Sequence, residues 1–179
     1  KHEHILTIED PIEFVDESKK CLVNQREVHR DTQSFSNALR AALREDPDII
    51  LVGELRDLET IRLALSAAKT IDRIIDVFPG EEKQLVRSML SESLRAVVAQ
   101  TLLKKVGGGR VAAHEVLVGT SAVKNLIRED KVAQIYSMIQ TGAQYGMQTL
   151  DQALQVLVRS GTIDRTTAAS KAHDKNNFM

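Results

Sequence analysis

The amino-acid sequence predicts an α/β fold: a mostly parallel sheet with flanking helices, followed by a smaller helical part. Two short segments rich in β-branched residues, 4–9 and 49–52, have the composition of strands, and the second is expected to be buried on both faces. Between them, residues 35–43 carry apolar side chains at helical spacing. The order strand, helix, strand is typical of the crossover that joins parallel strands.

The composition limits the possible classes of protein. A length of 179 residues fits one domain, or one domain with a small appendage, and 42% hydrophobic with 3% aromatic residues predicts an aliphatic core. The net charge of −1 does not favour nucleic-acid binding. The single cysteine, Cys21, excludes an internal disulfide and fits a reducing compartment. No apolar run approaches the ~20 residues that span a bilayer, so we expect no direct membrane insertion. The start at Lys1, without a methionine, suggests a piece of a larger protein.

Carboxylates follow both predicted strands. The first strand ends in Glu9 and Asp10, and Glu13 follows after Pro11, which stiffens the turn. Parallel strands would bring Glu13 and Glu54 to the same edge of the sheet, where α/β proteins bind ligands. Clustered carboxylates there suit Mg²⁺ with a bound phosphate, because Mg²⁺ prefers oxygen ligands. Two alternatives remain open: the acids form a solvated turn, and Glu54 caps the next helix.

The segments around these strands are predicted from turn and helix signals. Residues 16–33 are polar and are expected to be irregular. The helix that begins near Phe35 can be capped by Asp31, Thr32 or Ser34, and Asp46-Pro47 ends it. After the second strand come Gly53, Glu54, Arg56 and Asp57, with Asp57 as the expected N-cap of a helix over 58–68.

The remaining chain is predicted to be mainly helical. A long amphipathic helix is expected over Glu81–Lys104, and the glycines at 107–109 are expected to form a hairpin-like turn rather than a phosphate loop. A third strand is expected over Val111–Val118. Three short helices, ending with one capped by Gly161, and a fraying tail from Ala168 complete the chain.

Three motifs together resemble the secretion-ATPase superfamily, and in particular its pilus retraction ATPases. Residues 5–14 (ILTIEDPIEF) are similar to the Asp box of that family, and residues 46–57 (DPDIILVGELRD) are similar to its Walker B motif. Residues 122–129 (AVKNLIRE) closely resemble the retraction signature AIRNLIRE, and residues 114–117 (HEVL) also fit. The resemblance covers nearly the whole chain except its last dozen or so residues.

The resemblance implies a RecA-like, hexameric ATPase that uses ATP and Mg²⁺ to power type IV pilus retraction and twitching motility. It implies a cytoplasmic motor, peripheral to the inner membrane through a pilus platform protein. Glu54 would be the Walker B acid that activates or orients water, and Glu13 would act through Mg²⁺ or its water, with Glu9 and Asp10 in support. Residues 1–118 would form a partial ATPase core and 119–179 a helical subdomain. In that subdomain the signature residues Ala122, Val123, Lys124, Asn125, Leu126, Ile127, Arg128 and Glu129 would couple hydrolysis to retraction.

Two departures from the family pattern bear on activity. The chain contains no G-x-x-x-x-G-K-[ST] P-loop, the cradle for ATP phosphates, which in the family lies before the Asp box. Between Ala68 and Lys69 about fifteen residues of the family pattern are missing, including a His box and a central strand. Two explanations remain open: the gene carries a deletion, or a loop of the protein is left out of this sequence. We therefore expect that this chain alone does not hydrolyse ATP. The alternatives are a catalytically incomplete interaction or oligomerisation module and, less favoured, a metal-dependent phosphatase.

Overall fold

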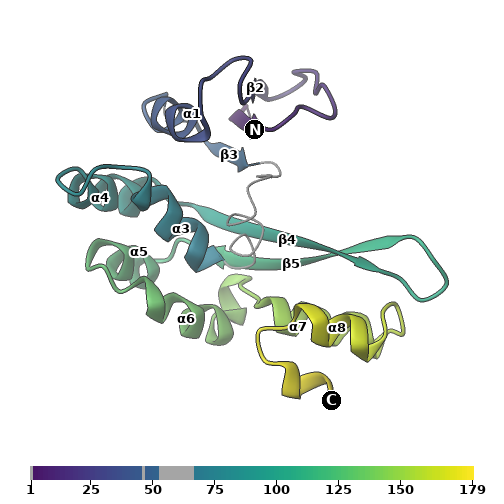
Figure 1. The fold of residues 1–179 in the computed structure, drawn as a ribbon. Helices are drawn as coiled ribbons and strands as arrows, with labels where there is room; N and C mark the ends of the chain where they lie inside the picture. Colours follow the sequence, from purple (N-terminus) through teal and green to yellow (C-terminus); the bar gives the residue numbers. More distant parts are fainter. Residues whose placement is uncertain (1, 46, 53–66) are drawn as a thin grey trace. The chain divides into compact units, whose positions relative to one another are not determined.

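The computed structural model describes residues 2–45, 47–52 and 67–179. The chain forms two compact units, Lys1–Arg62 and Leu63–Met179 (Figure 1). The first contains a three-stranded parallel sheet with a helix, and the second an antiparallel hairpin with several helices. The predicted α/β class is confirmed. The predicted division of the chain at residues 118 and 119 stays a prediction.

The parallel sheet of the first unit has the strand order β2-β1-β3. Strand β1 (His4–Glu9) lies in the centre, and both β2 (Leu22–Glu27) and β3 (Ile49–Val52) run parallel to it. The two strands expected from the sequence are therefore confirmed. The prediction that residues 16–33 are irregular was wrong for β2, because pairing with β1 supplies the order that its polar composition does not.

Asp48 fixes the register between β1 and β3. Its carboxylate accepts the backbone N–H of His4 at 2.8 Å, and its own backbone N–H donates to the carbonyl oxygen of His4 at 2.9 Å. This exchange sets Ile8 opposite Val52 at the far end of the pair. Both strands therefore end at the same edge of the sheet, as the sequence predicted.

The apolar side chains of β3 are more exposed than the sequence suggested. Ile49 is 43%, Leu51 51% and Val52 37% exposed, so the prediction of burial on both faces was wrong. The physical reason is position, because β3 is an outer strand of this sheet and pairs only with β1 among the described residues. The buried strand is β1, whose Leu6 and Ile8 are at most 1% exposed.

Helix α1 (Phe35–Ala42) contacts β1 and begins at a capped end. The N-cap is Ser34, one of the three predicted candidates, and its hydroxyl accepts the backbone N–H of Asn37 at 3.2 Å. The side chains of Ala38, Leu39 and Ala42 are at most 1% exposed. These residues share one helix face, which forms the apolar cover of the first unit.

The second unit is built on the hairpin of β4 (Ala96–Lys104) and β5 (Arg110–Val118). Gly107, Gly108 and Gly109 in the connecting turn all have positive φ, a conformation that glycine adopts without strain. The predicted third strand and the hairpin-like glycine turn are confirmed. The predicted helix over Glu81–Lys104 was wrong, because α4 covers only Lys83–Ser93.

The helix after Glu81 was predicted to be too long because no local signal in the sequence marks its end. No glycine or proline marks the end of α4, and the apolar residues beyond it keep spacings that a helix would also show. Leu94 leaves helical geometry with ψ of 123°, and the chain then pairs with β5 over nine residues. The β-branched Val97 and Val98 fit that ladder, so pairing with β5 overrides the helical pattern.

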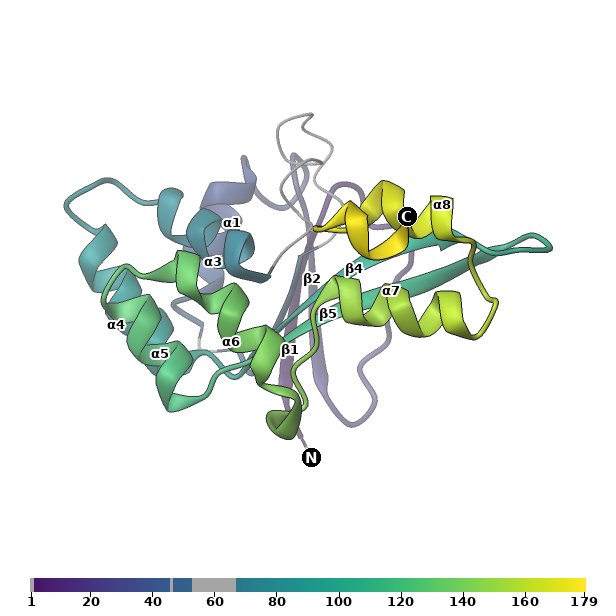
Figure 2. The ribbon, with the colours of Figure 1, turned by 90° about the horizontal axis from the view of Figure 1, so that it is seen from below.

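The helices of the second unit form two clusters along the hairpin (Figure 2). One apolar cluster joins Leu117 of β5 to the helices from α3 to α6, and the other joins Leu103 and Ala113 to the helices after residue 149. These elements are α3 (Ala67–Asp76), α4, α5 (Ser121–Arg128), η1 (Val132–Gln134), α6 (Ile135–Thr141), η2 (Ala143–Tyr145), α7 (Leu150–Arg159), α8 (Arg165–Lys171) and η3 (Lys175–Phe178).

The C-terminal tail is packed, so the prediction that it frays from Ala168 was wrong. Ala168 is fully buried and Phe178 is 5% exposed, both in the second apolar cluster. The buried carboxylate of Asp151 accepts the backbone N–H groups of His173 and Asp174 at 2.7 and 2.9 Å. Two buried apolar residues and one buried carboxylate therefore hold a segment that is polar by composition.

Gly119 is expected to be intolerant of any side chain. A Cβ atom at this position would lie 2.3 Å from the backbone oxygen of Leu94, and the Gly119 N–H donates to Arg95 O at 2.7 Å. We expect Gly119→Ala to lower the free energy of unfolding by about 1–3 kcal/mol, as overpacking does. Gly80→Ala, where nothing lies within 4 Å, is the control. Equal thermal stability of the two variants would contradict the prediction.

Candidate functional site

Glu9 stands at the carboxyl end of β1 with its side chain held in place. Its Oε1 accepts the hydroxyl of Thr7 at 2.6 Å and the amide of Gln25 at 3.0 Å. Both donors are uncharged, and Gln25 comes from the neighbouring strand β2. The carboxylate is therefore oriented by the sheet, which suits the supporting role predicted for it.

The acidic turn after β1 is anchored to β2. The backbone N–H of Ile12 donates to the Glu27 carboxylate at 3.1 Å, which holds the turn containing Asp10 against the last residue of β2. The side chain of Glu13 is exposed, and that of Asp10 is partly buried. Glu27 was not among the residues predicted from the sequence, since its strand was expected to be irregular. The acid at the strand end was the only signal available.

The second half of the predicted site lies outside the described residues. Gly53, Glu54, Arg56 and Asp57 all belong to it, so the meeting of Glu13 and Glu54 stays a prediction. The structure shows that β1 and β3 pair in parallel, which is the strand arrangement on which the predicted site depends. Within residues 2–45, 47–52 and 67–179, no group of three or more His, Cys, Asp or Glu side chains is placed to hold a metal ion.

Helix α5 carries nearly all of the signature over 122–129. Thr120 caps its start, where the hydroxyl accepts the backbone N–H of Val123 at 3.4 Å. Val123 and Ile127 are fully buried in the first apolar cluster of the second unit, and Leu126 packs against that cluster. The exposed positions of the signature are Ala122, Asn125, Arg128 and Glu129.

Charged and polar contacts hold both ends of α5. The ammonium of Lys124 donates to the backbone oxygen of Glu92, near the end of α4, at 2.9 Å. Glu129 accepts from Lys131 at 2.7 Å and from Asn125 at 2.8 Å. These hydrogen bonds, that from Lys131 first, lower the pKa of Glu129 below its ordinary value. The signature helix is thus fixed on α4 while its outer face stays accessible.

A charge cluster joins α3, α4 and the turn after α5. The guanidinium of Arg87, with its side chain 15% exposed, pairs with the Asp130 carboxylate at 2.7 Å. Burial raises the pKa of Asp72 above its ordinary value, the carboxylates of Asp76 and Asp130 raise it further, and Arg87 opposes them. At neutral pH Asp72 is ionised, and keeping its charge in this cluster therefore lowers the free energy of unfolding.

Asp72→Asn is expected to stabilise the fold slightly at pH 7. An acid with a raised pKa stabilises the folded state when it is protonated, so the variant's advantage should vanish below about pH 4, near the unfolded pKa. The effect is small because the Asp72 carboxylate is only partly desolvated and the residue remains largely open to solvent, which screens its charge. Thermal melts between pH 4 and 8 measure it. Glu129→Gln is the matched comparison with opposite sign, destabilising at pH 7, since its pKa is lowered. A lower stability of Asp72→Asn at pH 7 would contradict the expectation.

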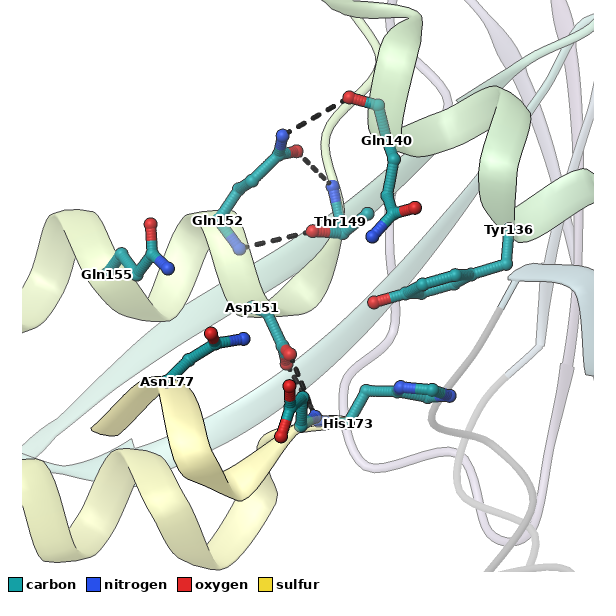
Figure 3. Close-up of a pocket in the computed structure, with 9 residues that line it drawn as sticks. Tyr136, Gln140, Thr149, Asp151, Gln152, Gln155, His173 and Asn177 are labelled. Carbon is teal, nitrogen blue, oxygen red and sulfur yellow. Dashed lines mark hydrogen bonds between the residues drawn. The ribbon is translucent and has the colours of Figure 1, made fainter. Parts of the chain in front are cut away.

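An open, polar pocket lies among the C-terminal helices (Figure 3). The ring of Tyr136 stacks on His173 with centroids 4.6 Å apart. Burial raises the pKa of the Tyr136 hydroxyl, and the charge on Asp151 raises it further. Asp151 has a structural role here, because its carboxylate accepts the backbone N–H groups of His173 and Asp174. The pocket therefore lies where the C-terminal tail packs against the helices. Its lining consists of Tyr136, Gln140, Thr149, Asp151, Gln152, Gln155, His173, Asp174 and Asn177.

Comparison with known proteins confirms the resemblance to the pilus retraction ATPases. Residues 1–73 match the family of type II/IV secretion system proteins. The chain is 68% identical, over 99% of its length, to the type IV pilus retraction ATPase PilT of Pseudomonas aeruginosa, and 59% identical, over 98%, to a twitching motility protein of Neisseria gonorrhoeae. It spans about half the length of these relatives, 56% and 51% respectively.

Solved structures agree with the sequence comparison. The crystal structure of the pilus retraction motor PilT with bound ADP superimposes with a TM-score of 0.66 and 47% identity, covering 97% of this chain and 54% of the other. The Legionella pneumophila ATPase DotB gives a TM-score of 0.62 and 29% identity, covering 93% and 50%. Among the described helices, none is both long and apolar enough to cross a membrane.

The gap predicted between Ala68 and Lys69 stays a prediction.

Proposed function

We propose that this chain is the C-terminal part of the ATPase domain of a pilus retraction motor of the type II/IV secretion family. In this proposal the whole protein hydrolyses ATP to power type IV pilus retraction and thereby twitching motility. The observation that carries it is the 68% identity to the Pseudomonas retraction ATPase over 99% of this chain. The ADP bound in the structurally similar motor supports a nucleotide as ligand.

The proposed chemistry places two acids at the sheet edge. Glu54 orients or activates the attacking water, and Glu13 acts through Mg²⁺ or its water ligands. Phosphoryl transfer depends mainly on positioning and charge stabilisation, and carboxylates supply both for a metal and a water. Glu9, oriented by its bonds to Thr7 and Gln25, supports the edge from β1 together with Asp10.

Mg²⁺ with ATP phosphates fits the donor chemistry of these residues. Mg²⁺ keeps several waters and needs only one or two protein carboxylates beside the phosphate oxygens. The exposed side chain of Glu13 can be reached by such a complex. Mg²⁺ would supply charge neutralisation at the phosphates, while Glu13 and Glu54 would hold its water ligands.

The proposal includes an assembly and a location. Six copies form a ring, and the outer face of α5, with Asn125 and Arg128, couples hydrolysis to a platform protein at the inner membrane. The exposure of these side chains, on a helix fixed to α4 by Lys124, supports a docking role. The motor is then cytoplasmic and reaches the membrane only through this partner.

Phosphate release with Mg²⁺-ATP tests the proposal. The full-length protein is expected to turn over ATP, whereas the 179-residue chain is expected not to, because it contains no P-loop. A full-length protein that neither binds nor hydrolyses ATP would overturn the proposed motor. Measurable turnover by the 179-residue chain would show that a phosphate cradle exists in it.

A second candidate is supported for this chain taken alone. The sequence contains no P-loop, which favours a non-catalytic module that joins a ring or docks on a platform. Sedimentation of the 179-residue chain without nucleotide discriminates the two. A stable oligomer favours the module, and a monomer that assembles only as full-length protein with nucleotide favours the motor.

A further inference from the structure

Glu115 is a buried carboxylate that contacts the first residues of two helices. It lies on β5, is 2% exposed, and belongs to the HEVL segment noted in the sequence. Its Oε1 accepts the backbone N–H of Ala67 in α3 at 2.8 Å, and its Oε2 accepts the backbone N–H of Leu150 in α7 at 3.3 Å. The two amides are 83 residues apart in sequence yet share one side chain.

The chemistry of helix starts explains why a carboxylate stands there. The first N–H groups of a helix have no partner within it, and an anion near the start is stabilised by the helix dipole. The N-cap Thr149 bonds to the backbone N–H of Gln152, so the N–H of Leu150 is left for Glu115. One buried negative charge thus supplies acceptors to both helices, and each contact lowers the cost of burying it.

We propose that Glu115 is a positioning residue that couples the start of α3 to the start of α7. When one helix start opens, the carboxylate loses a partner and its hold on the other helix start weakens. Ala67 is the residue at which α3 begins in the described chain, 13 positions after Glu54 in sequence. On the proposed function, on which this meaning rests, the coupling carries the effect of a bound nucleotide on Ala67 to α7.

The shape of glutamine makes a sharp test available. Glu115→Gln keeps the size of the side chain but has a single acceptor oxygen, and its NH₂ group would face a backbone N–H. It can therefore hold one helix start but not both. Thr149→Ala removes the N-cap of α7 without touching Glu115 and opens that helix start.

Amide hydrogen exchange of the 179-residue chain measures the coupling. We expect Thr149→Ala to speed exchange at Leu150 and at Ala67 together, each about fivefold, as loss of an N-cap predicts. In the Glu115→Gln background the acceleration should persist near Leu150 and be absent at Ala67. Asp164→Ala is the matched control, because it removes the N-cap of α8 and should leave Ala67 unchanged.

Each outcome decides the proposal. Acceleration at Leu150 without acceleration at Ala67, in the chain with native Glu115, overturns it, and this result does not require Glu115→Gln to fold. Equal acceleration at Ala67 by Asp164→Ala also overturns it, since the effect is then a global loss of stability. In the full-length protein, ADP should slow exchange at both amides, and at Ala67 alone in Glu115→Gln. Absence of ADP binding would refute the proposed function, while the cap-removal result would still decide the coupling.

Discussion

Replacing Glu54 by glutamine in the full-length protein is expected to lower the rate of ATP hydrolysis by about 10²- to 10⁴-fold, the range lost with a general base. Glutamine keeps the size of the side chain but cannot take a proton from the attacking water. Nucleotide affinity should change little, because the phosphates are bound by other groups. The loss should therefore appear in kcat rather than in KM.

The measurement is steady-state phosphate release beside nucleotide binding by fluorescence or calorimetry. Glu17→Gln is the matched control, since it makes the same change at an exposed position between β1 and β2. A Glu54→Gln variant that hydrolyses ATP as fast as the control would exclude Glu54 from the chemistry. A variant that no longer binds nucleotide would assign it a binding role in place of a catalytic one.

Leu117→Ala is expected to destabilise the second unit by about 2–5 kcal/mol, the range for large apolar side chains cut back in cores. Leu117 is fully buried at the point where β5 meets the first apolar cluster, so its loss leaves a cavity between the hairpin and α3 to α6. A loss of this size is a large fraction of the stability of an ordinary domain.

Urea unfolding followed by tyrosine fluorescence isolates this effect, because both tyrosines, Tyr136 and Tyr145, lie in the second unit. Leu85→Ala is the control. Leu85 is 63% exposed on α4, and surface substitutions away from special features stay within about 0.5 kcal/mol. Equal midpoints for the two variants would contradict the packing described for Leu117.

The sequence was informative wherever the local pattern and the tertiary contacts agree. β1 and β3 were predictable because their β-branched residues stand between clear turn signals, and α1 because Ser34 precedes an apolar face. It failed where tertiary pairing decides. Strand β2 is polar and is ordered by β1, and β4 has a spacing that also suits a helix. The tail was misjudged because Phe178 and Asp151 act over a distance that composition does not register.

The same division applies to the candidate site. Glu9, Asp10 and Glu13 could be chosen because acids at a strand end are visible in the sequence. Residues whose role depends on contacts between different strands or helices could not be chosen from the sequence. The residues next to them along the chain do not identify their partners in space. Glu27 supports the acidic turn and Asp48 sets the register of β3 only once the strands are paired.

The two faces of α5 have a consequence for how the signature is used to classify sequences. Val123 and Ile127 are fully buried, so any helix packed in this way would need residues of similar volume there. Ala122, Asn125, Arg128 and Glu129 meet solvent, and on the proposed function they are the positions that a partner would contact. A search that weighs all eight positions equally would accept chains that share only the packing. On the proposed function, we expect a search restricted to the solvent-facing positions to separate relatives by the partner they engage.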